Sequence, residues 1–188
     1  MKTGVKGACV FVLGMAMATG MALAQDGSAN RASLPPGPGS ESPLAREVHH
    51  QLVLLPYYNV FDNLAFRVEG SAVTLIGQVV NPITKDDAAR AVRGIEGVTH
   101  VNNQIEVLPV SPMDAQIRRA EFRAVYSSPG FEKYAIQAVP PIHIIVKNGN
   151  VTLVGVVQNQ MDKTLAGTRA NTVPNVFHVT NDLQVENR

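Results

Sequence analysis

Cysteine is nearly absent from this chain, whose 188 residues include a single cysteine, Cys9, and no tryptophan. Cys9 lies in a leader that we expect to be removed, which leaves the rest of the chain without any cysteine. A chain without thiols forms no disulfide, no thiolate metal site and no cysteine nucleophile. Long apolar stretches are also scarce, because none after the leader reaches the roughly 20 apolar residues that a membrane-spanning helix needs.

The first 24 residues have the pattern of a secretory signal peptide. Lys2 and Lys6 supply a positive start, and an apolar stretch covers residues 8–23. Small residues then occupy both positions of an A-x-A cleavage site, Ala22-Leu23-Ala24. We therefore expect export and cleavage before Gln25.

Charge of one sign is not in excess. The chain has 16 Lys and Arg against 15 Asp and Glu, and loss of the two leader lysines leaves 14 against 15, a net charge of −1. Such a chain lacks the strong positive field of a nucleic-acid binder, so we expect no nucleic-acid partner. We expect no lipid anchor either, because Cys9 follows Ala8 at the start of the apolar stretch instead of standing at the cleavage point. The exported protein is expected to be soluble.

An internal repeat organises the rest of the chain. At an offset of 78 residues, Val73-Thr74-Leu75-Ile76-Gly77 returns as Val151-Thr152-Leu153-Val154-Gly155. Without gaps, residues 64–107 and 142–185 share 14 identities in 44 positions. The chain is therefore an internal duplication.

Local signals in the first copy predict the order helix, strand, strand, helix, strand. Ser42-Pro43 opens a helix that runs to about Leu54. Strands are expected at residues 64–68, 73–80 and 98–108. Thr84 is expected to cap the second helix, with Asp86 and Asp87 in its first turn.

The second copy follows the same plan. Ser111-Pro112 opens its first helix, Asn148-Gly149 is a two-residue hairpin turn, and its second helix is expected at about residues 161–171. The segment 127–141 lengthens the path into its first strand. The predicted class is α+β.

The predicted domains follow from these patterns. Residues 25–42 are rich in Gly, Ser, Pro and Asn, which predicts a flexible linker. The units 43–109 and 112–188 are then two tandem αββαβ domains, each with a three-stranded sheet and two helices.

The pattern of both units resembles the BON domain. The first copy matches it at Val73, Thr74, Leu75, Gly77, Val79, Ala88, Gly97, Val98, Val101, Asn103 and Val107. The second copy matches it at Val151, Thr152, Leu153, Gly155, Val157, Ala166, Val176, Val179, Asn181 and Val185. Asn175 stands where the family has glycine, as Gly97 does in the first copy. The resemblance covers nearly all of the chain after Ser42 and implies a mixed sheet with two helices packed on it.

The resemblance also implies a role. Proteins with a signal peptide and two BON domains resemble the osmotically inducible periplasmic proteins and the outer-membrane-integrity lipoproteins of Gram-negative bacteria. This implies a non-enzymatic periplasmic protein that binds phospholipid surfaces or envelope proteins and supports envelope integrity or stress tolerance. Because the lipobox cysteine is missing, membrane attachment is expected to be peripheral.

Five residues of the repeat are predicted to be structural. Gly77 and Gly155 stand in strands, where glycine lets another backbone approach closely. Gly97 fits the end of a helix, and Asn103 and Asn181 are placed to hydrogen-bond a neighbouring loop.

No residue set has the pattern of an active site, a cofactor site or a metal site. Asp86 and Asp87 are explained by capping and by the helix dipole. The histidines have no spacing that brings two of them together with a carboxylate, and His143 is expected to face solvent from a strand. We therefore expect no catalysis, no cofactor and no metal.

The first helix of the second copy is the candidate binding surface. Arg118, Arg119 and Arg123 lie within six residues, and the last two share a face at i, i+4. Each cation contributes about 1 kcal/mol near an anionic bilayer, which predicts weak, salt-sensitive lipid binding. The alternative is an ordinary solvated face whose charge Asp114 and Glu121 offset. A protein-binding adaptor is the second candidate function, because three-stranded sheets expose edges that accept a partner strand.

Overall fold

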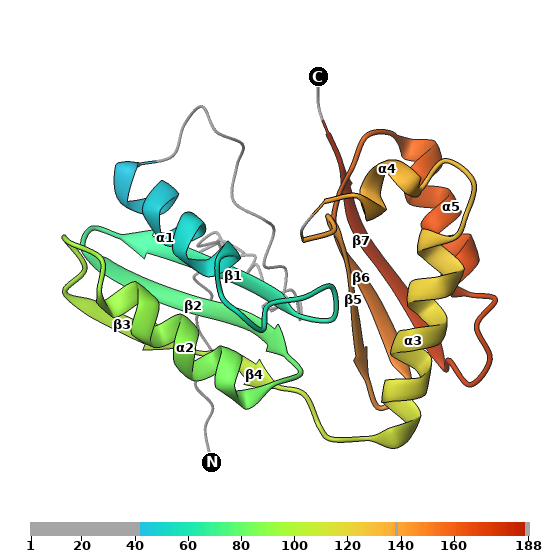
Figure 1. Cartoon of the computed structure of the whole chain (residues 1–188), viewed down its shortest axis with the longest axis horizontal. Helices are drawn as coiled ribbons and strands as arrows, with labels where there is room; N and C mark the ends of the chain where they lie inside the picture. Colours follow the sequence, from blue (N-terminus) through green and yellow to red (C-terminus); the bar gives the residue numbers. More distant parts are fainter. Residues whose placement is uncertain (1–41, 138, 187–188) are drawn as a thin grey trace, which may run out of the picture.

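The computed structural model describes residues 42–137 and 139–186, so the predicted signal peptide and nearly all of the predicted linker lie outside the described residues. Figure 1 shows two units, each a small sheet with helices on one face, joined by a short connection at residues 108–111. The predicted α+β class with two tandem αββαβ units is confirmed. Within the described ranges, no helix is both long enough and apolar enough to cross a membrane.

Unit 1 begins at the predicted helix cap. Its elements are α1 (Pro43–Val53), β1 (Asn63–Glu69), β2 (Ala72–Val79), α2 (Pro82–Arg93), β3 (His100–Asn103) and β4 (Glu106–Val107). The Ser42 hydroxyl accepts a hydrogen bond from the N–H of Ala45 at 3.1 Å, and Pro43 occupies the first turn.

Helix α2 begins earlier than predicted. Asn81, and not Thr84, is its cap, because the Asn81 side chain accepts the N–H of Ile83 at 3.0 Å and Pro82 opens the helix. Thr84 is buried inside the first turn. The pair 86–87 therefore falls in the second turn, where Asp87 forms an ion pair of 2.7 Å with Arg90.

Unit 2 repeats this plan with one added helix. Its elements are α3 (Pro112–Tyr126), α4 (Glu132–Ala135), β5 (Ile142–Lys147), β6 (Asn150–Val157), α5 (Gln160–Ala170) and β7 (His178–Val185). The predicted hairpin turn is present, since Asn148 and Gly149 have φ of 51° and 76°, the left-handed values of a tight hairpin. Helix α4 lies in the lengthened segment, for which no helix was predicted.

Both sheets are mixed. β1 pairs antiparallel with β2, while β3 and β4 both pair parallel with β2. In unit 2, β5 pairs antiparallel with β6, and β7 pairs parallel with β6. The helices α2 and α5 make the crossovers that parallel neighbours require. The predicted continuous strand 98–108 is wrong for unit 1, where it is divided into β3 and β4, although the N–H of Gln104 still donates to the carbonyl of Leu75 at 2.8 Å.

The strand glycines of the repeat allow the first strand to approach the second. Gly77 and Gly155 have φ of 124° and 138°. A Cβ atom at either position would clash with a backbone carbonyl, that of Asn63 in unit 1 and that of Pro141 in unit 2. Glycine is therefore required at these positions by both conformation and space.

The paired asparagines connect the last strand to the crossover helix in both units. The Asn103 amide donates to the carbonyl of Lys85 at 2.9 Å, and the Asn181 amide donates to the carbonyl of Lys163 at 2.7 Å. Each side-chain oxygen accepts the N–H two residues further on. The partner is thus a helix and not the neighbouring loop that we expected. The turn before that strand has the same left-handed backbone conformation in both units, since Gly97 and Asn175 have φ of 91° and 67°.

The two units contact each other through a loop of unit 1, a contact that the sequence does not predict. The loop between α1 and β1 crosses to unit 2, where Val60 lies in the hydrophobic core and its carbonyl accepts the N–H of Ile144 at 2.8 Å. The buried Asp62 shapes this loop, because its carboxylate accepts the N–H groups of Val80 at 2.7 Å and Asn59 at 3.1 Å. Unit 1 thereby covers the outer edge of β5.

Candidate functional site

Helix α3 carries the arginines predicted to bind lipid, and its two faces differ in kind. It begins at Ser111, whose hydroxyl accepts the N–H of Asp114 at 3.1 Å. The buried face consists of Asp114, Ile117, Arg118, Glu121, Val125 and Tyr126. The exposed residues are Pro112, Met113, Gln116, Arg119, Phe122 and Arg123. Three charged residues therefore occupy the stripe that a surface helix usually fills with apolar side chains.

The Asp114 carboxylate is buried and hydrogen-bonded inside unit 2. Its two carboxylate oxygens accept the N–H groups of Asn148 and Gly149, each at 2.9 Å. The start of α3 is thus fixed to the hairpin between β5 and β6. This carboxylate is only 1% exposed and takes no part in the outer surface.

Arg118 also points inward, which corrects the predicted cluster of three surface arginines. It is 6% exposed, and its Nη2 donates to the carbonyl of Val146 at 2.8 Å. Burial lowers the pKa of Arg118, while Asp114 and Asp62 oppose this effect, and an arginine remains charged under such conditions. Helical spacing places position 118 one turn after Asp114 on the buried stripe, and the Val146 carbonyl of β5 lies there to accept the hydrogen bond of the side chain.

Glu121 is completely buried, and within the described chain neither of its carboxylate oxygens has a hydrogen-bond partner. Burial raises the pKa of Glu121 from 4.5 to about 8, so the side chain is mostly protonated at neutral pH. A neutral, buried Glu121 does not offset the charge of the outer arginines. The alternative of a charge-balanced helix face therefore loses both of its acidic residues.

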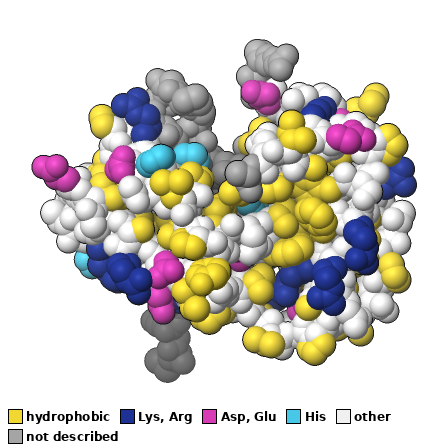
Figure 2. Space-filling view, in the orientation of Figure 1, with side chains coloured by type: hydrophobic (Ala, Val, Ile, Leu, Met, Phe, Trp, Pro, Cys, Tyr) yellow, Lys and Arg dark blue, Asp and Glu magenta, His cyan; other side chains and the backbone are white. Residues whose placement is uncertain are grey.

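The outer face of α3 is cationic and partly aromatic. Arg119 and Arg123 are exposed, and no ion pair of either is found among the described residues. Phe122 lies next to them and is 37% exposed. Figure 2 shows dark blue basic side chains beside yellow hydrophobic ones on this part of unit 2.

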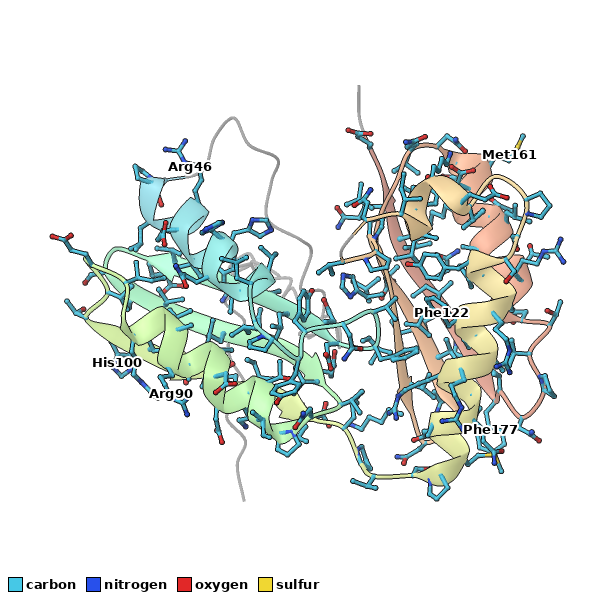
Figure 3. All side chains as sticks on the ribbon, viewed as in Figure 1. Arg46, Arg90, His100, Phe122, Met161 and Phe177 are labelled. Atoms are coloured by element: carbon cyan, nitrogen blue, oxygen red, sulfur yellow. The ribbon has the colours of Figure 1, made fainter. Side chains whose placement is uncertain are left out.

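An aromatic layer supports Phe122 from behind. Its ring lies 4.9 Å from that of Tyr126 and 6.3 Å from that of Phe61, centroid to centroid. Figure 3 shows Phe122 on the side of α3 that faces unit 1, which supplies Phe61. Tyr126 is held in turn by the hydrogen bond that its hydroxyl donates to the carbonyl of Ile142 at 2.5 Å. The Phe122 ring is therefore held in place by packed aromatic side chains while its outer edge remains exposed.

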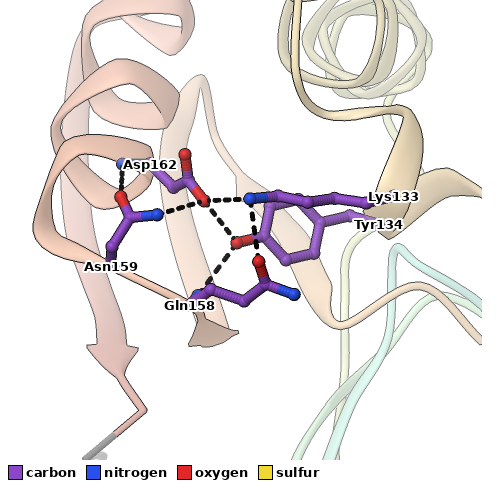
Figure 4. Close-up of polar contacts among 5 residues, drawn as sticks. All are labelled: Lys133, Tyr134, Gln158, Asn159 and Asp162. Atoms are coloured by element: carbon purple, nitrogen blue, oxygen red, sulfur yellow. Dashed lines mark hydrogen bonds and ion pairs between the residues drawn. The ribbon is translucent and has the colours of Figure 1, made fainter.

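A polar network fixes the added helix α4 to α5, as Figure 4 shows. Asp162 accepts hydrogen bonds from Lys133 at 2.7 Å, Tyr134 at 2.6 Å and Asn159 at 3.1 Å. The Tyr134 hydroxyl also accepts the N–H of Gln158 at 2.9 Å. Burial acts to raise the pKa of Asp162, but the hydrogen bonds from Lys133 and Tyr134 outweigh it and hold that pKa below its usual value. Every member is occupied by another, so the network is a structural clamp.

The histidines are spread over four elements of the fold. His49 and His50 are exposed on α1, His100 on β3 and His178 on β7. His143 is 4% exposed and stacks on Tyr58, so the expectation that it faces solvent is wrong. The reason is the loop of unit 1, which covers β5 from outside. In the described part of the chain, no three His, Cys, Asp or Glu residues are arranged to hold a metal ion.

Sequence reasoning missed two features of this region. The burial of Glu121 and the Tyr58–His143 stack both depend on segments that are distant in the chain. One local signal was available for Glu121, because it lies four residues after Ile117 and four before Val125, on the stripe that they define.

One family model matches the chain in both units. The family model described as the BON domain matches residues 41–109 and 131–187. No curated protein matches the chain. Among solved structures, the C-terminal domain of CdsD, the structural protein of the type III secretion system of Chlamydia trachomatis, is 14% identical and covers 79% of this chain and 100% of its own, with a TM-score of 0.32. A second CdsD structure is also 14% identical and covers 77% of this chain and 93% of its own, with a TM-score of 0.31.

The family matches cover both sheets and their crossover helices. The second match begins after α3, so the helix with the exposed arginines lies outside it. The two matches together span more than half of the chain. The chain therefore belongs to the BON domain family and carries two BON units in tandem.

Proposed function

We propose that this chain is a non-enzymatic module of the cell envelope that docks on anionic phospholipid surfaces through the outer face of α3. One observation carries the proposal, the separation of charge across this helix. Arg119 and Arg123 lie outside with Phe122, whereas the acidic side chains of Asp114 and Glu121 lie inside. The outer surface is consequently cationic without an offset from its own helix.

The expected strength of docking follows from the two exposed cations. At about 1 kcal/mol for each cation near an anionic surface, two arginines contribute about 2 kcal/mol. This corresponds to a preference of roughly 30-fold for anionic over neutral lipid. Salt should weaken the attraction, because the screening length is about 8 Å at physiological ionic strength. The partly exposed ring of Phe122 adds an apolar contact at the interface.

Membership in the BON family supports an envelope setting, and the predicted signal peptide supports the periplasm. A role in envelope integrity or osmotic stress tolerance rests on the resemblance to exported proteins with two BON domains. Because α3 lies outside the second family match, the docking face has to be tested on this chain itself.

Flotation with liposomes tests the proposal. The chain from Gln25 onward is mixed with phosphatidylglycerol-containing vesicles or with neutral phosphatidylcholine vesicles, at about 50 mM and at about 500 mM NaCl. We expect flotation with anionic vesicles at low salt, and loss of flotation with neutral lipid or at high salt. The double variant Arg119→Glu/Arg123→Glu should no longer float.

A matched control separates this face from overall charge. The double variant Arg46→Glu/Arg93→Glu makes the same change in net charge on exposed helix positions of unit 1 and should float like the wild type. Failure of the wild-type chain to float with anionic vesicles at low salt would end the proposal. Equal loss of flotation in both double variants would show attraction by net charge and not by α3.

A protein-binding adaptor is the second candidate, and the free edge of β7 favours it. β7 has eight residues and, among the described strands, pairs only with β6, whereas the β5 edge is covered by Val60. An unpaired strand edge can accept a strand of a partner protein. A photo-crosslinker at the exposed Gln184 should then give a discrete adduct with another envelope protein, and one at Arg46 should not. Self-links alone, together with vesicle binding, would reject the adaptor.

A further inference from the structure

We infer that Asn148 is a site of spontaneous covalent modification, and that the buried carboxylate of Asp114 controls the rate of its conversion to aspartate or isoaspartate. Asn148 is exposed in the hairpin turn between β5 and β6, and Gly149 follows it directly. The sequence has no other Asn-Gly pair. The inference concerns this hairpin and the start of α3, and it does not depend on the proposed lipid docking.

The reaction needs only solvent water and the two residues of the turn. The backbone nitrogen of Gly149 attacks the side-chain carbon Cγ of Asn148, so a new nitrogen–carbon bond forms and the bond between Cγ and Nδ2 breaks. Ammonia leaves with the proton of the Gly149 N–H, and a cyclic imide, a succinimide, remains. Water then opens this ring. Addition of water at Cγ gives aspartate, and addition at the main-chain carbonyl carbon gives isoaspartate.

The side chain of Asn148 is free to react. Both hydrogen bonds of this residue within the described ranges use its backbone, the N–H as donor to Asp114 and the carbonyl as acceptor from Asn150. Glycine as the next residue favours the attack, because it has no side chain to hinder the approach of its nitrogen. Asparagine is also among the residues that are chemically labile in proteins. The turn therefore has the reactive pair in place, and the rate depends on the Gly149 nitrogen.

That nitrogen is held by Asp114. The N–H of Gly149 donates to Oδ1 of Asp114 at 2.9 Å, while Oδ2 accepts the N–H of Asn148 at 2.9 Å. The carboxylate is only 1% exposed, and hydrogen bonds to a carboxylate are among the strong ones in proteins. A nitrogen whose proton is bound in this way cannot attack until the turn opens locally. The rate in the folded chain is therefore the rate of the open turn multiplied by the fraction of time that the turn is open.

The ring of Phe177 also covers Gly149. A Cβ atom at position 149 would lie 2.7 Å from Cδ2 of this ring, so the ring lies directly against the glycine. Gly149 is buried, although Phe177 itself is 82% exposed. Figure 3 shows Phe177 at the same end of unit 2 as the start of α3. Water and base therefore reach the Gly149 nitrogen only when the turn moves away from both groups.

The repeat provides an internal comparison. At the offset of 78 residues, the equivalent turn of unit 1 is Gly70-Ser71, which has no side-chain amide. There the Ser71 hydroxyl lies 2.8 Å from the Thr99 hydroxyl, at the positions that Gly149 and Phe177 occupy in unit 2. The reactive turn is therefore a feature of unit 2 alone.

Conversion weakens the bonds between the hairpin and α3. An aspartate at position 148 adds a negative charge close to the buried Asp114 carboxylate, and like charges repel strongly where water is excluded. An isoaspartate inserts an extra carbon atom into the main chain of a tight two-residue turn, whose backbone conformation is then lost. Because Asp114 fixes the start of α3 to this turn, either product frees the first turn of the helix.

Timed incubation of the chain from Gln25 onward in mildly alkaline buffer tests the inference, with proteolysis and peptide mass spectrometry as the readout. In urea, Asn148 should be the first asparagine to convert, because the unfolded chain has no bond from Gly149 to Asp114. In the folded chain, it should convert at least tenfold more slowly. Exchange of the Gly149 N–H with deuterium should be slowed by a similar factor, because the same opening exposes the nitrogen to both reactions.

A variant of the carboxylate tests its control of the rate. Asp114→Asn removes the charge and creates no new Asn-Gly pair, because Ala115 follows. It should raise the conversion rate at Asn148 in the folded chain at least fivefold and raise exchange of the Gly149 N–H by a similar factor. Asp86→Asn, at an exposed position of unit 1, is the matched control and should leave both rates unchanged. A thermal melt confirms that each variant is folded during the incubation.

A second variant reproduces the product. Asn148→Asp should increase hydrogen exchange in the first turns of α3 at least fivefold and leave α2 of unit 1 unchanged. Asn102→Asp makes the same change of charge at an exposed position of β3 and should leave exchange in α3 unchanged.

Three outcomes would overturn the inference. They are conversion of Asn148 as fast in the folded wild type as in urea, an unchanged conversion rate in folded Asp114→Asn, and unchanged exchange of α3 in Asn148→Asp. If Asp114→Asn does not fold, the comparison of folded and unfolded wild type decides, since it requires no variant.

Discussion

Replacing Glu121 by glutamine should stabilise the protein at neutral and alkaline pH and leave its stability in acid nearly unchanged. The folded-state pKa of Glu121 is raised to about 8 from 4.5, so the folded chain binds this proton more tightly than the unfolded chain. The contribution of Glu121 to stability is therefore most favourable below pH 4.5, falls as the pH rises towards 8, and is constant above that. Glutamine keeps the size and polarity of the protonated acid but does not ionise.

The magnitude follows from the same pKa. One pKa step corresponds to about 1.36 kcal/mol, so a rise from 4.5 to about 8 corresponds to about 5 kcal/mol of lost stability above pH 8. The carboxyl is fully covered but not deep within a large protein, and water penetration and relaxation reduce such a penalty, so we halve it. Glu121→Gln should then raise the free energy of unfolding by roughly 2 kcal/mol at pH 8 and by close to zero at pH 4.5.

Urea unfolding followed by circular dichroism at several pH values from 4.5 to 8.5 measures this difference. Other groups titrate in the same range, so the decisive quantity is the difference between variant and wild type at each pH. Glu96→Gln, at an exposed position, is the matched control and should show no such trend. A difference for Glu121→Gln that is independent of pH, or that makes the variant less stable at pH 8, would refute the assignment of a buried protonated carboxyl.

The remaining predictions concern one contact between the units and two contacts within unit 2. Val60→Ala should lower the free energy of unfolding by about 1 to 3 kcal/mol and increase hydrogen exchange in β5 of unit 2, because this side chain of unit 1 lies in the core of unit 2. Faster exchange confined to unit 1 would contradict this. Gly155→Ala should lower the free energy of unfolding by more than about 3 kcal/mol, because a Cβ atom there meets a backbone carbonyl. Gly130→Ala, at a left-handed φ with open space around it, should lower it by only about 1 to 2 kcal/mol. Equal urea midpoints for the two variants would disprove the steric argument. Asn181→Ala should cost about 1 to 3 kcal/mol, since it leaves the Lys163 carbonyl without its side-chain partner, and a thermal melt unchanged from the wild type would be inconsistent with that bond.

Features that depend on neighbours in the chain were predictable. Ser42 and Ser111 cap their helices because a cap hydroxyl bonds an N–H three residues on, and Asn148-Gly149 turns because both residues tolerate positive φ. The cap of α2 was misassigned because Asn81-Pro82 and Thr84 are competing local signals only three residues apart. When two possible caps lie this close together, only the position of the helix in the folded structure shows which residue is the cap.

The sequence did not show which charged side chains of α3 are buried. The sequence places Arg118, Arg119 and Arg123 close together, but helical spacing alone does not say whether a charged side chain on the inner stripe is buried or reaches back to solvent. Arg118 turns inward because the Val146 carbonyl of β5 lies there to accept its hydrogen bond. Ile117 and Val125 place Glu121 on the inner stripe, but no local pattern indicates that its carboxylate stays buried without any described hydrogen-bond partner.

The sequence by itself determined the duplication, the order of elements in each unit and the positions of the essential glycines and asparagines. These follow from backbone conformation and from hydrogen bonds that recur at the same offset in both copies. Only the tertiary structure decided which charges are exposed and how the units join. The loop that carries Val60 and Asp62 packs against β5 from the other unit, and this contact buries His143. Burial depends on the segments that pack over a residue, and those segments lie far away in the chain.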